Sequence, residues 1–184
     1  MPTIYLIRHA YADWTPSDDR PLSAQGQAAA VALAERFDSR SIASIFSSPS
    51  RRALDTVAPL AARRQLPPSV LHDLRERELT LPAGLTFEQA VARTWTEPES
   101  ALPASESNRV AQKRGLSAVK GILAAHPSED VAISTHGNLL ALIVNGFDGR
   151  FGYEFWQELT FPDAYAARFN GDTLVDLQRI WETA

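Results

Sequence analysis

Short apolar runs alternate along the chain with longer segments of helical periodicity, and this alternation is the strongest constraint on the fold. The runs at 3–7, 42–46 and 131–135 have the length and composition of buried strands. Strands that alternate with helices assemble into a sheet with helices packed on its faces. The sequence therefore predicts an α/β fold, a three-layer α/β/α sandwich with a mostly parallel central sheet, which leaves room for an antiparallel edge.

Helix signals follow each of these runs. Ser23 can cap a helix that extends to about Phe37, and Ser48 followed by Pro49 is a favourable start for the next helix. We expect further helices over three segments, at 86–95, 107–125 and 138–145.

Three other segments complete the predicted topology. Residues 18–21 are turn-like, and residues 70–74 form a third short strand or extended piece. The tail at 165–180 is expected to fold into a hairpin around Asn170-Gly171, a pair that favours tight turns.

The length of 184 residues predicts a single domain, 1–184, with one sizeable core. Within it, the segment around 77–108 contains prolines, Trp95 and one short predicted helix. We expect this segment to be a cap over a site or a specificity insertion rather than another core layer. Substrate specificity is expected to reside there and in residues 147–163.

Composition excludes several classes of partner. The net charge is −4, and the arginines are interleaved with acidic and apolar residues, so nucleic acid is not an expected partner. No apolar run approaches the ~18 residues of a membrane span, and residues 1–8 lack the pattern of a secretion signal. A cytoplasmic protein without membrane contact is expected. The absence of cysteine excludes thiol chemistry.

Charged and histidine side chains stand where four predicted elements end or begin. Arg8 and His9 follow the first strand, and Arg52 lies in the first turn of the helix after the second. Glu76 follows the third extended piece, and His136 ends the strand before Gly137. Ligands gather beyond the carboxyl ends of parallel strands, so we expect these side chains to converge on one site.

Two arginines and two histidines suit a phosphate monoester. Arg8 and Arg52 supply permanent charge for the peripheral oxygens, and the helix start at Arg52 also favours an anion. A neutral His9 can attack phosphorus while a protonated His136 helps to hold the oxygens. The set therefore predicts metal-independent phosphoryl transfer with His9 as the nucleophile.

The leaving alkoxide needs a proton, which a carboxylic acid in a partly desolvated pocket can supply. Glu76 is the leading candidate for this acid, and Glu78 is the alternative. His72 and His126 are interpreted as ordinary surface or core residues, and the aromatic residues at 151–156 are interpreted as packing residues.

These motifs resemble, in the same order, those of the histidine phosphatase superfamily, also called the phosphoglycerate mutase-like family. Residues 6–10, Leu-Ile-Arg-His-Ala, are similar to its N-terminal Arg-His-Gly signature, and residues 47–56 are similar to its second arginine motif. Residues 74–77 resemble the segment that carries the proton donor, and residues 134–138 the segment with the second histidine. Residues 19–26 also match the family's Asp-x-Pro-Leu-Thr/Ser and Gly pattern.

The resemblance implies a phosphoglycerate mutase-like fold and a phosphohistidine on His9. It also implies that Arg8, Arg52 and His136 bind phosphate, that Glu76 is the acid, and that no cofactor or metal takes part. The implied substrate is a small phosphorylated metabolite or a phosphoprotein. Its identity and the oligomeric state are not predicted.

Two departures bear on the reaction. Ala10 replaces the usual glycine, and residues 11–15 lack the Glu-Ser/Thr-x-x-Asn sequence of the mutases. Hydrolysis by a phosphatase is therefore favoured over the alternative, a 2,3-bisphosphoglycerate-dependent phosphoglycerate mutase. Two other classes stay open: a phosphate-binding module without turnover, and a metal hydrolase, although no His-Glu-x-x-His ligand spacing is present.

Overall fold

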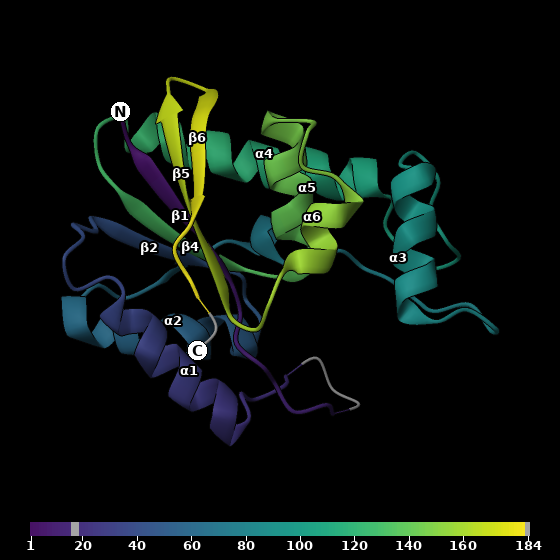
Figure 1. Ribbon diagram of the computed structural model, residues 1–184, viewed down its shortest axis with the longest axis horizontal. Coiled ribbons are helices and arrows are strands. Elements are labelled where there is room, and N and C mark those ends of the chain that lie inside the picture. Colours follow the sequence, from purple (N-terminus) through teal and green to yellow (C-terminus); the bar gives the residue numbers. More distant parts are fainter. Residues whose placement is uncertain (16–18, 183–184) are drawn as a thin grey trace.

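The central element of the fold is a six-stranded sheet with the strand order β3-β2-β4-β1-β5-β6 (Figure 1). The computed structural model describes residues 1–15 and 19–182, so Asp18 of the predicted turn lies outside the described residues. The strands are β1 (Thr3–Arg8), β2 (Ser44–Ser47), β3 (Ser69–Val70), β4 (Val131–Thr135), β5 (Asp163–Asn170) and β6 (Thr173–Arg179).

Strand direction divides the sheet into two parts. The strands β3, β2, β4 and β1 run parallel to one another, whereas β5 pairs antiparallel with both β1 and β6. The β5–β6 hairpin turns at Gly171, whose φ of 57° lies in the left-handed region that glycine adopts without strain. The predicted α/β fold, its mostly parallel sheet and its terminal hairpin are confirmed.

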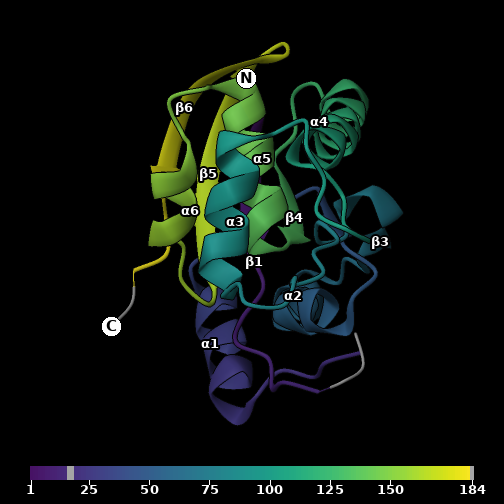
Figure 2. The ribbon, with the colours of Figure 1, turned by 90° about the vertical axis from the view of Figure 1, so that its right-hand side faces the viewer.

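Helices cover both faces of the sheet (Figures 1 and 2). Helices α1 and α2 lie on one side, and α4, α5 and α6 lie on the other. Figure 1 shows α3 set apart from the sheet. The helices are α1 (Ala24–Glu35), α2 (Arg51–Arg64), α3 (Phe87–Thr96), α4 (Asn108–Ala125), α5 (Gly137–Phe147) and α6 (Tyr153–Glu158), with a short 3₁₀ helix, η1, at His72–Leu74.

The alternation of side chains along β1 explains the three layers. Ile4 and Leu6 belong to the core shared with α4 and α5, whereas Tyr5 and Ile7 belong to the core shared with α1 and α2. Successive residues of a strand point to opposite faces, so an uninterrupted apolar run is buried on both sides.

Several helix starts are confirmed. Ser23 accepts a hydrogen bond from the Gly26 amide at 3.0 Å and begins α1. Ser107 caps α4, and Thr86 forms a reciprocal capping box at α3.

The predicted start of α2 at Ser48 is wrong by two residues. The helix begins at Arg51 after Ser50. The Ser48 hydroxyl lies 2.7 Å from His136 Nε2 and accepts the amide of Ser50 at 3.2 Å, so it contacts His136 and the turn before the helix instead of capping the helix itself. The third extended piece is also shorter than predicted. It divides into β3 and η1. Helix α6 was not predicted.

Candidate active site

His9 lies in the first position after β1, where the neighbouring strand and helix fix its backbone. The His9 amide donates to the Thr135 carbonyl at 3.0 Å, and the Ala10 amide donates to Thr56 Oγ1 at 2.9 Å. Thr56 Oγ1 in turn donates to the Arg52 carbonyl at 2.6 Å. This chain of bonds connects the loop after β1 to the first turns of α2.

The hydrogen bonds of the His9 ring define its tautomer. Nδ1 lies 2.7 Å from the Ala10 carbonyl oxygen, which can only accept, so Nδ1 carries the proton. Arg52 Nε donates to Nε2 at 3.2 Å, which requires a lone pair on Nε2. The ring therefore presents its unprotonated nitrogen to the arginine, as a nucleophile in a phosphate site must.

Burial keeps His9 neutral. The side chain is 8% exposed, and desolvation lowers its pKa to about 3, against a smaller opposing effect of the Ala10 hydrogen bond. The positive charges of Arg52, Arg8 and Arg20 are the smaller part of the same lowering. The nucleophilic form thus persists well below neutral pH.

Acid is expected to destabilise the protein through His9. An unfolded histidine has a pKa of ~6.5, so between that value and about 3 only the unfolded state binds this proton, and the free energy of unfolding falls as the pH falls. At pH 5 the loss attributable to His9 is about 2 kcal/mol. Urea unfolding at pH 7 and pH 5 measures it, and the loss in His9→Gln should be smaller by that amount. An identical loss in both proteins would contradict the buried neutral ring.

Arg8 reaches the site from the end of β1. Its Nη1 donates to the Leu159 carbonyl at 2.7 Å, and its guanidinium carbon lies 3.5 Å from the centroid of the Phe161 ring. Burial lowers the pKa of Arg8 to about 10, so it stays charged at neutral pH. A Cβ at Gly137 would lie 2.9 Å from the guanidinium carbon, and glycine therefore permits this close approach.

His136 lies beneath His9 and is completely buried. The two ring centroids are 5.1 Å apart, but His136 is not among the described residues that line the cavity. Burial, followed by the charges of His9 and Arg52, lowers the pKa of His136 well below its ordinary value. The protonated ring predicted from the sequence therefore requires the negative charge of a bound phosphate, and it stays a prediction.

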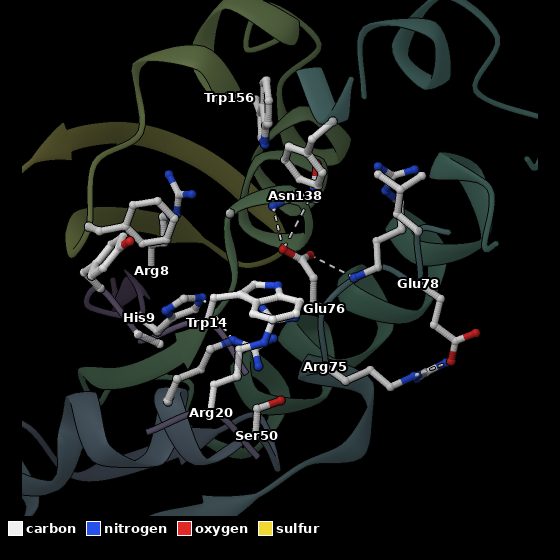
Figure 3. Close-up of a pocket in the computed structure, with 18 of the residues that line it drawn as sticks. Arg8, His9, Trp14, Arg20, Ser50, Arg75, Glu76, Glu78, Asn138 and Trp156 are labelled. Carbon is white, nitrogen blue, oxygen red and sulfur yellow. Dashed lines mark hydrogen bonds and ion pairs between the residues drawn. The ribbon is translucent and has the colours of Figure 1, made fainter. Parts of the chain in front are cut away.

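Glu76 is held at the N-terminus of α5. Its carboxylate accepts hydrogen bonds from the amides of Arg77 at 2.8 Å and Leu139 at 3.0 Å. It also accepts one from the amide of Asn138 at 3.2 Å (Figure 3). The amides of Asn138 and Leu139 belong to the first turn of the helix, where backbone donors have no partner within the helix. Glu78 is exposed instead, and it pairs with Arg75 at 3.9 Å. Both carboxylates line the cavity, and only Glu76 is held there by backbone amides, so the choice between them as the acid stays a prediction.

The loop that carries Glu76 is fastened by Arg114 of α4. Arg114 donates to the backbone carbonyls of Asp73, Arg75 and Glu76 at 2.8, 2.9 and 3.1 Å. It also forms two bonds with Glu106, at 2.8 and 2.7 Å, and both side chains are at least nine-tenths buried. Arg114 therefore holds the backbone of the loop that carries Glu76.

Arg114→Met is expected to lower the free energy of unfolding by roughly 3 kcal/mol, because it leaves the buried Glu106 carboxylate without its cation. Urea unfolding measures the loss. Adding Glu106→Gln to this variant should restore part of it, since the uncompensated charge is then removed. A loss below about 1 kcal/mol in the single variant would contradict this role.

The predicted residues surround a cavity of about 610 Å³. Arg8, His9, Arg52 and Glu76 line it, whereas His136 is buried with its ring centroid 5.1 Å from that of His9. The sequence reasoning missed part of the wall, namely the arginines and aromatic residues Arg20, Arg77, Tyr11, Trp14, Phe87, Trp156 and Phe161. Figure 3 shows Trp14 and Trp156 at the cavity among the charged side chains. No periodicity or motif marks these aromatic residues, because folding alone brings their segments together.

The segment at 77–108 contributes the residues 77–79 and Phe87 to this wall. Its role as a cap or specificity insertion stays a prediction. No group of three or more histidine, aspartate or glutamate side chains in the described part of the chain could hold a metal ion. No helix within the described ranges is long and apolar enough to cross a membrane.

Comparison with known proteins extends these observations. A model of the histidine phosphatase superfamily (branch 1) matches residues 4–171. A metal-independent phosphoserine phosphatase of Arabidopsis thaliana is 30% identical over 162 residues, 76% of this chain and 66% of that protein. A probable phosphoglycerate mutase GpmB of Proteus mirabilis (strain HI4320) is 27% identical over 161 residues, 79% of this chain and 74% of that protein.

Comparison of the fold with solved structures agrees with the sequence comparisons. The structure of Bacillus stearothermophilus YhfR matches with a TM-score of 0.77 and 26% sequence identity, covering 95% of this chain and 94% of that one. The predicted phosphoglycerate mutase-like fold is confirmed. Since the family model spans nearly the whole chain and the histidine and arginine motifs meet in one cavity, this chain belongs to the histidine phosphatase superfamily.

Proposed function

We propose that the protein is a phosphatase that hydrolyses phosphate monoesters through a phosphohistidine on His9, without a metal ion. The observation that carries the proposal is the orientation of the neutral His9 ring, whose unprotonated Nε2 lies 3.2 Å from Arg52 Nε. A phosphoryl group bound by that arginine would meet the nucleophilic nitrogen directly.

The reaction has two steps. His9 Nε2 forms a bond to phosphorus as the bond between phosphorus and the alcohol oxygen breaks, and Glu76 transfers its proton to the departing alkoxide. A water molecule then attacks the phosphohistidine and gives a proton to Glu76, which releases inorganic phosphate and restores both residues.

Arg8, Arg52 and His136 are proposed to hold the peripheral oxygens. A dianionic phosphate in this cavity would favour the protonated form of His136, because an opposite charge nearby raises the pKa of a histidine. The buried rings and the guanidinium groups are in place before the substrate arrives, so little reorganisation is needed as charge develops.

The names of the two relatives point to different reactions. The Arabidopsis thaliana protein is named a metal-independent phosphoserine phosphatase, whereas the Proteus mirabilis protein is named a probable phosphoglycerate mutase. Small phosphorylated metabolites are accordingly the proposed substrates. The mutase is the second candidate, in which the phosphohistidine passes its phosphoryl group to another hydroxyl instead of water.

Rapid quench with labelled aryl phosphate tests the proposal. An acid-labile, base-stable phosphoenzyme should form before steady phosphate release, and a strong chelator should leave the rate unchanged. Binding of phosphate without any turnover would indicate a binding module instead. Incubation with a phosphoglycerate, with and without its bisphosphate, separates the two reactions, since a mutase forms the isomer faster than it releases phosphate.

A further inference from the structure

The ring of Phe161 lies against two residues of the proposed phosphate site. The guanidinium carbon of Arg8 lies 3.5 Å from the centroid of the Phe161 ring, and the centroids of the Phe161 and His9 rings are 5.4 Å apart. Both distances are in the range in which an aromatic ring attracts a cation or another ring. Figure 3 shows Arg8 and His9 on the same side of the cavity. One side chain outside the histidine and arginine motifs thus contacts the proposed nucleophile and a neighbouring cation.

The segment around Phe161 also contacts Arg8 through its backbone. Arg8 Nη1 donates to the Leu159 carbonyl at 2.7 Å, two residues before the ring. A Cβ at Gly137 would lie 2.9 Å from Arg8 Nε and 3.1 Å from Nη2, so the glycine backbone also limits where the guanidinium can lie. The ring, the carbonyl and the glycine together restrict the orientations open to Arg8. This restriction matters because an arginine holds a phosphate in a fixed geometry only when its N–H groups are directed at the oxygens.

Hydrogen bonds on both sides of Phe161 fix the backbone that carries it. The Thr160 amide donates to Asp163 Oδ2 at 2.9 Å, and Thr160 Oγ1 donates to the Pro162 carbonyl at 2.7 Å. Asp163 is completely buried, and its Oδ2 accepts a hydrogen bond from Arg179 Nη2 at 2.6 Å. Contacts within the protein therefore hold the Phe161 ring against Arg8.

The exposure of Phe161 separates its effect on the site from its effect on stability. The residue is 44% exposed and lines the cavity. A half-exposed ring removes less apolar surface from water than a core residue does, so its replacement costs the fold less. A loss of activity can then be measured in a folded variant.

We infer that Phe161 is a positioning residue, which holds Arg8 and His9 in the arrangement that receives the phosphoryl group. The inference rests on the proposed function and adds a residue to its site. An aromatic face attracts a guanidinium without using its N–H donors, whereas a carboxylate in the same place would bond to those donors and neutralise the charge. An aromatic residue can therefore orient Arg8 and leave its charge for the substrate.

Inorganic phosphate is the first probe, because it occupies the phosphoryl position and has no leaving group. Calorimetry of Phe161→Ala should give a phosphate dissociation constant roughly 3- to 30-fold above the original, the range for a cation–π contact. Its kcat/KM should fall roughly 10- to 100-fold, by a similar factor for nitrophenyl phosphate and for an alkyl phosphate, since the phosphoryl group is common to both.

Two further variants separate the aromatic face from simple apolar volume. Phe161→Tyr keeps the face, and its phosphate affinity and kcat/KM should stay within about threefold of the original. Phe161→Leu keeps only apolar volume and should resemble Phe161→Ala. Phe87→Ala is the matched control, because Phe87 is 49% exposed and lines the same cavity, but its ring lies 6.1 Å from that of Trp156. Its phosphate dissociation constant should stay within about twofold of the original.

An unchanged phosphate affinity in Phe161→Ala would overturn the inference, and losses that differ between the two esters would then assign Phe161 to the leaving group. Equal behaviour of the Tyr and Leu variants would also overturn it, because the aromatic face would have no role. Should Phe161→Ala fail to fold, the comparison of Tyr with Leu decides alone. Failure of the proposed function is distinct: the unaltered protein would bind phosphate without turnover, and the phosphate affinities would still test Phe161.

Discussion

His9→Ala is expected to lower kcat for an aryl phosphate by roughly 10⁴-fold or more, the scale seen when a nucleophile that acts within a catalytic unit is removed. The reason is that Nε2 of His9 is the atom that accepts the phosphoryl group, and alanine offers no replacement. Rapid quench of the variant should show no phosphoenzyme. Steady-state phosphate release measures the loss of rate.

His72→Ala is the matched control for this variant. His72 lies in η1 on the exposed surface, and we expect its kcat to stay within about twofold of the original. Inorganic phosphate should still raise the melting temperature of His9→Ala, because Arg8 and Arg52 remain in the cavity. Normal phosphoenzyme formation in His9→Ala would exclude the proposed nucleophile.

Glu76→Gln is expected to lower kcat/KM much more for phosphate esters with poor leaving groups than for esters with good leaving groups. For an alkyl phosphate the loss in kcat/KM should be about 10²- to 10⁴-fold, because the departing alkoxide is strongly basic and needs a proton. For nitrophenyl phosphate the loss should be below about tenfold, since nitrophenolate leaves without protonation. Measuring both substrates gives the ratio that identifies a general acid.

Glu78→Gln serves as the comparison for Glu76→Gln. The Glu78 side chain is 68% exposed and pairs with Arg75 at 3.9 Å. Its replacement should therefore change kcat/KM for either substrate, and the ratio between the two substrates, by no more than about threefold. If instead Glu78→Gln produced the dependence on the leaving group, the acid would be Glu78 and the bonds of Glu76 to α5 would be structural.

Local patterns in the sequence were sufficient for most of the fold. The apolar run at 3–7 predicted a strand that is buried on both faces. Ser23 predicted the start of α1, because a helix cap is a hydrogen bond between residues only three positions apart. The predictions for Ser48 and for residues 70–74 failed at element ends. There a long-range contact, such as Ser48 with His136, competes with the local preference of the backbone.

The sequence by itself determined which side chains follow the strands, and parallel pairing then brings Arg8, His9 and His136 to one edge of the sheet. Only the tertiary structure decided the protonation state of His9, since desolvation depends on every segment packed around the ring. The same is true of the charge left unpaired on Arg77. The Arg77 side chain is 2% exposed and none of its guanidinium nitrogens has a hydrogen-bond partner, because segments far apart in the sequence enclose it.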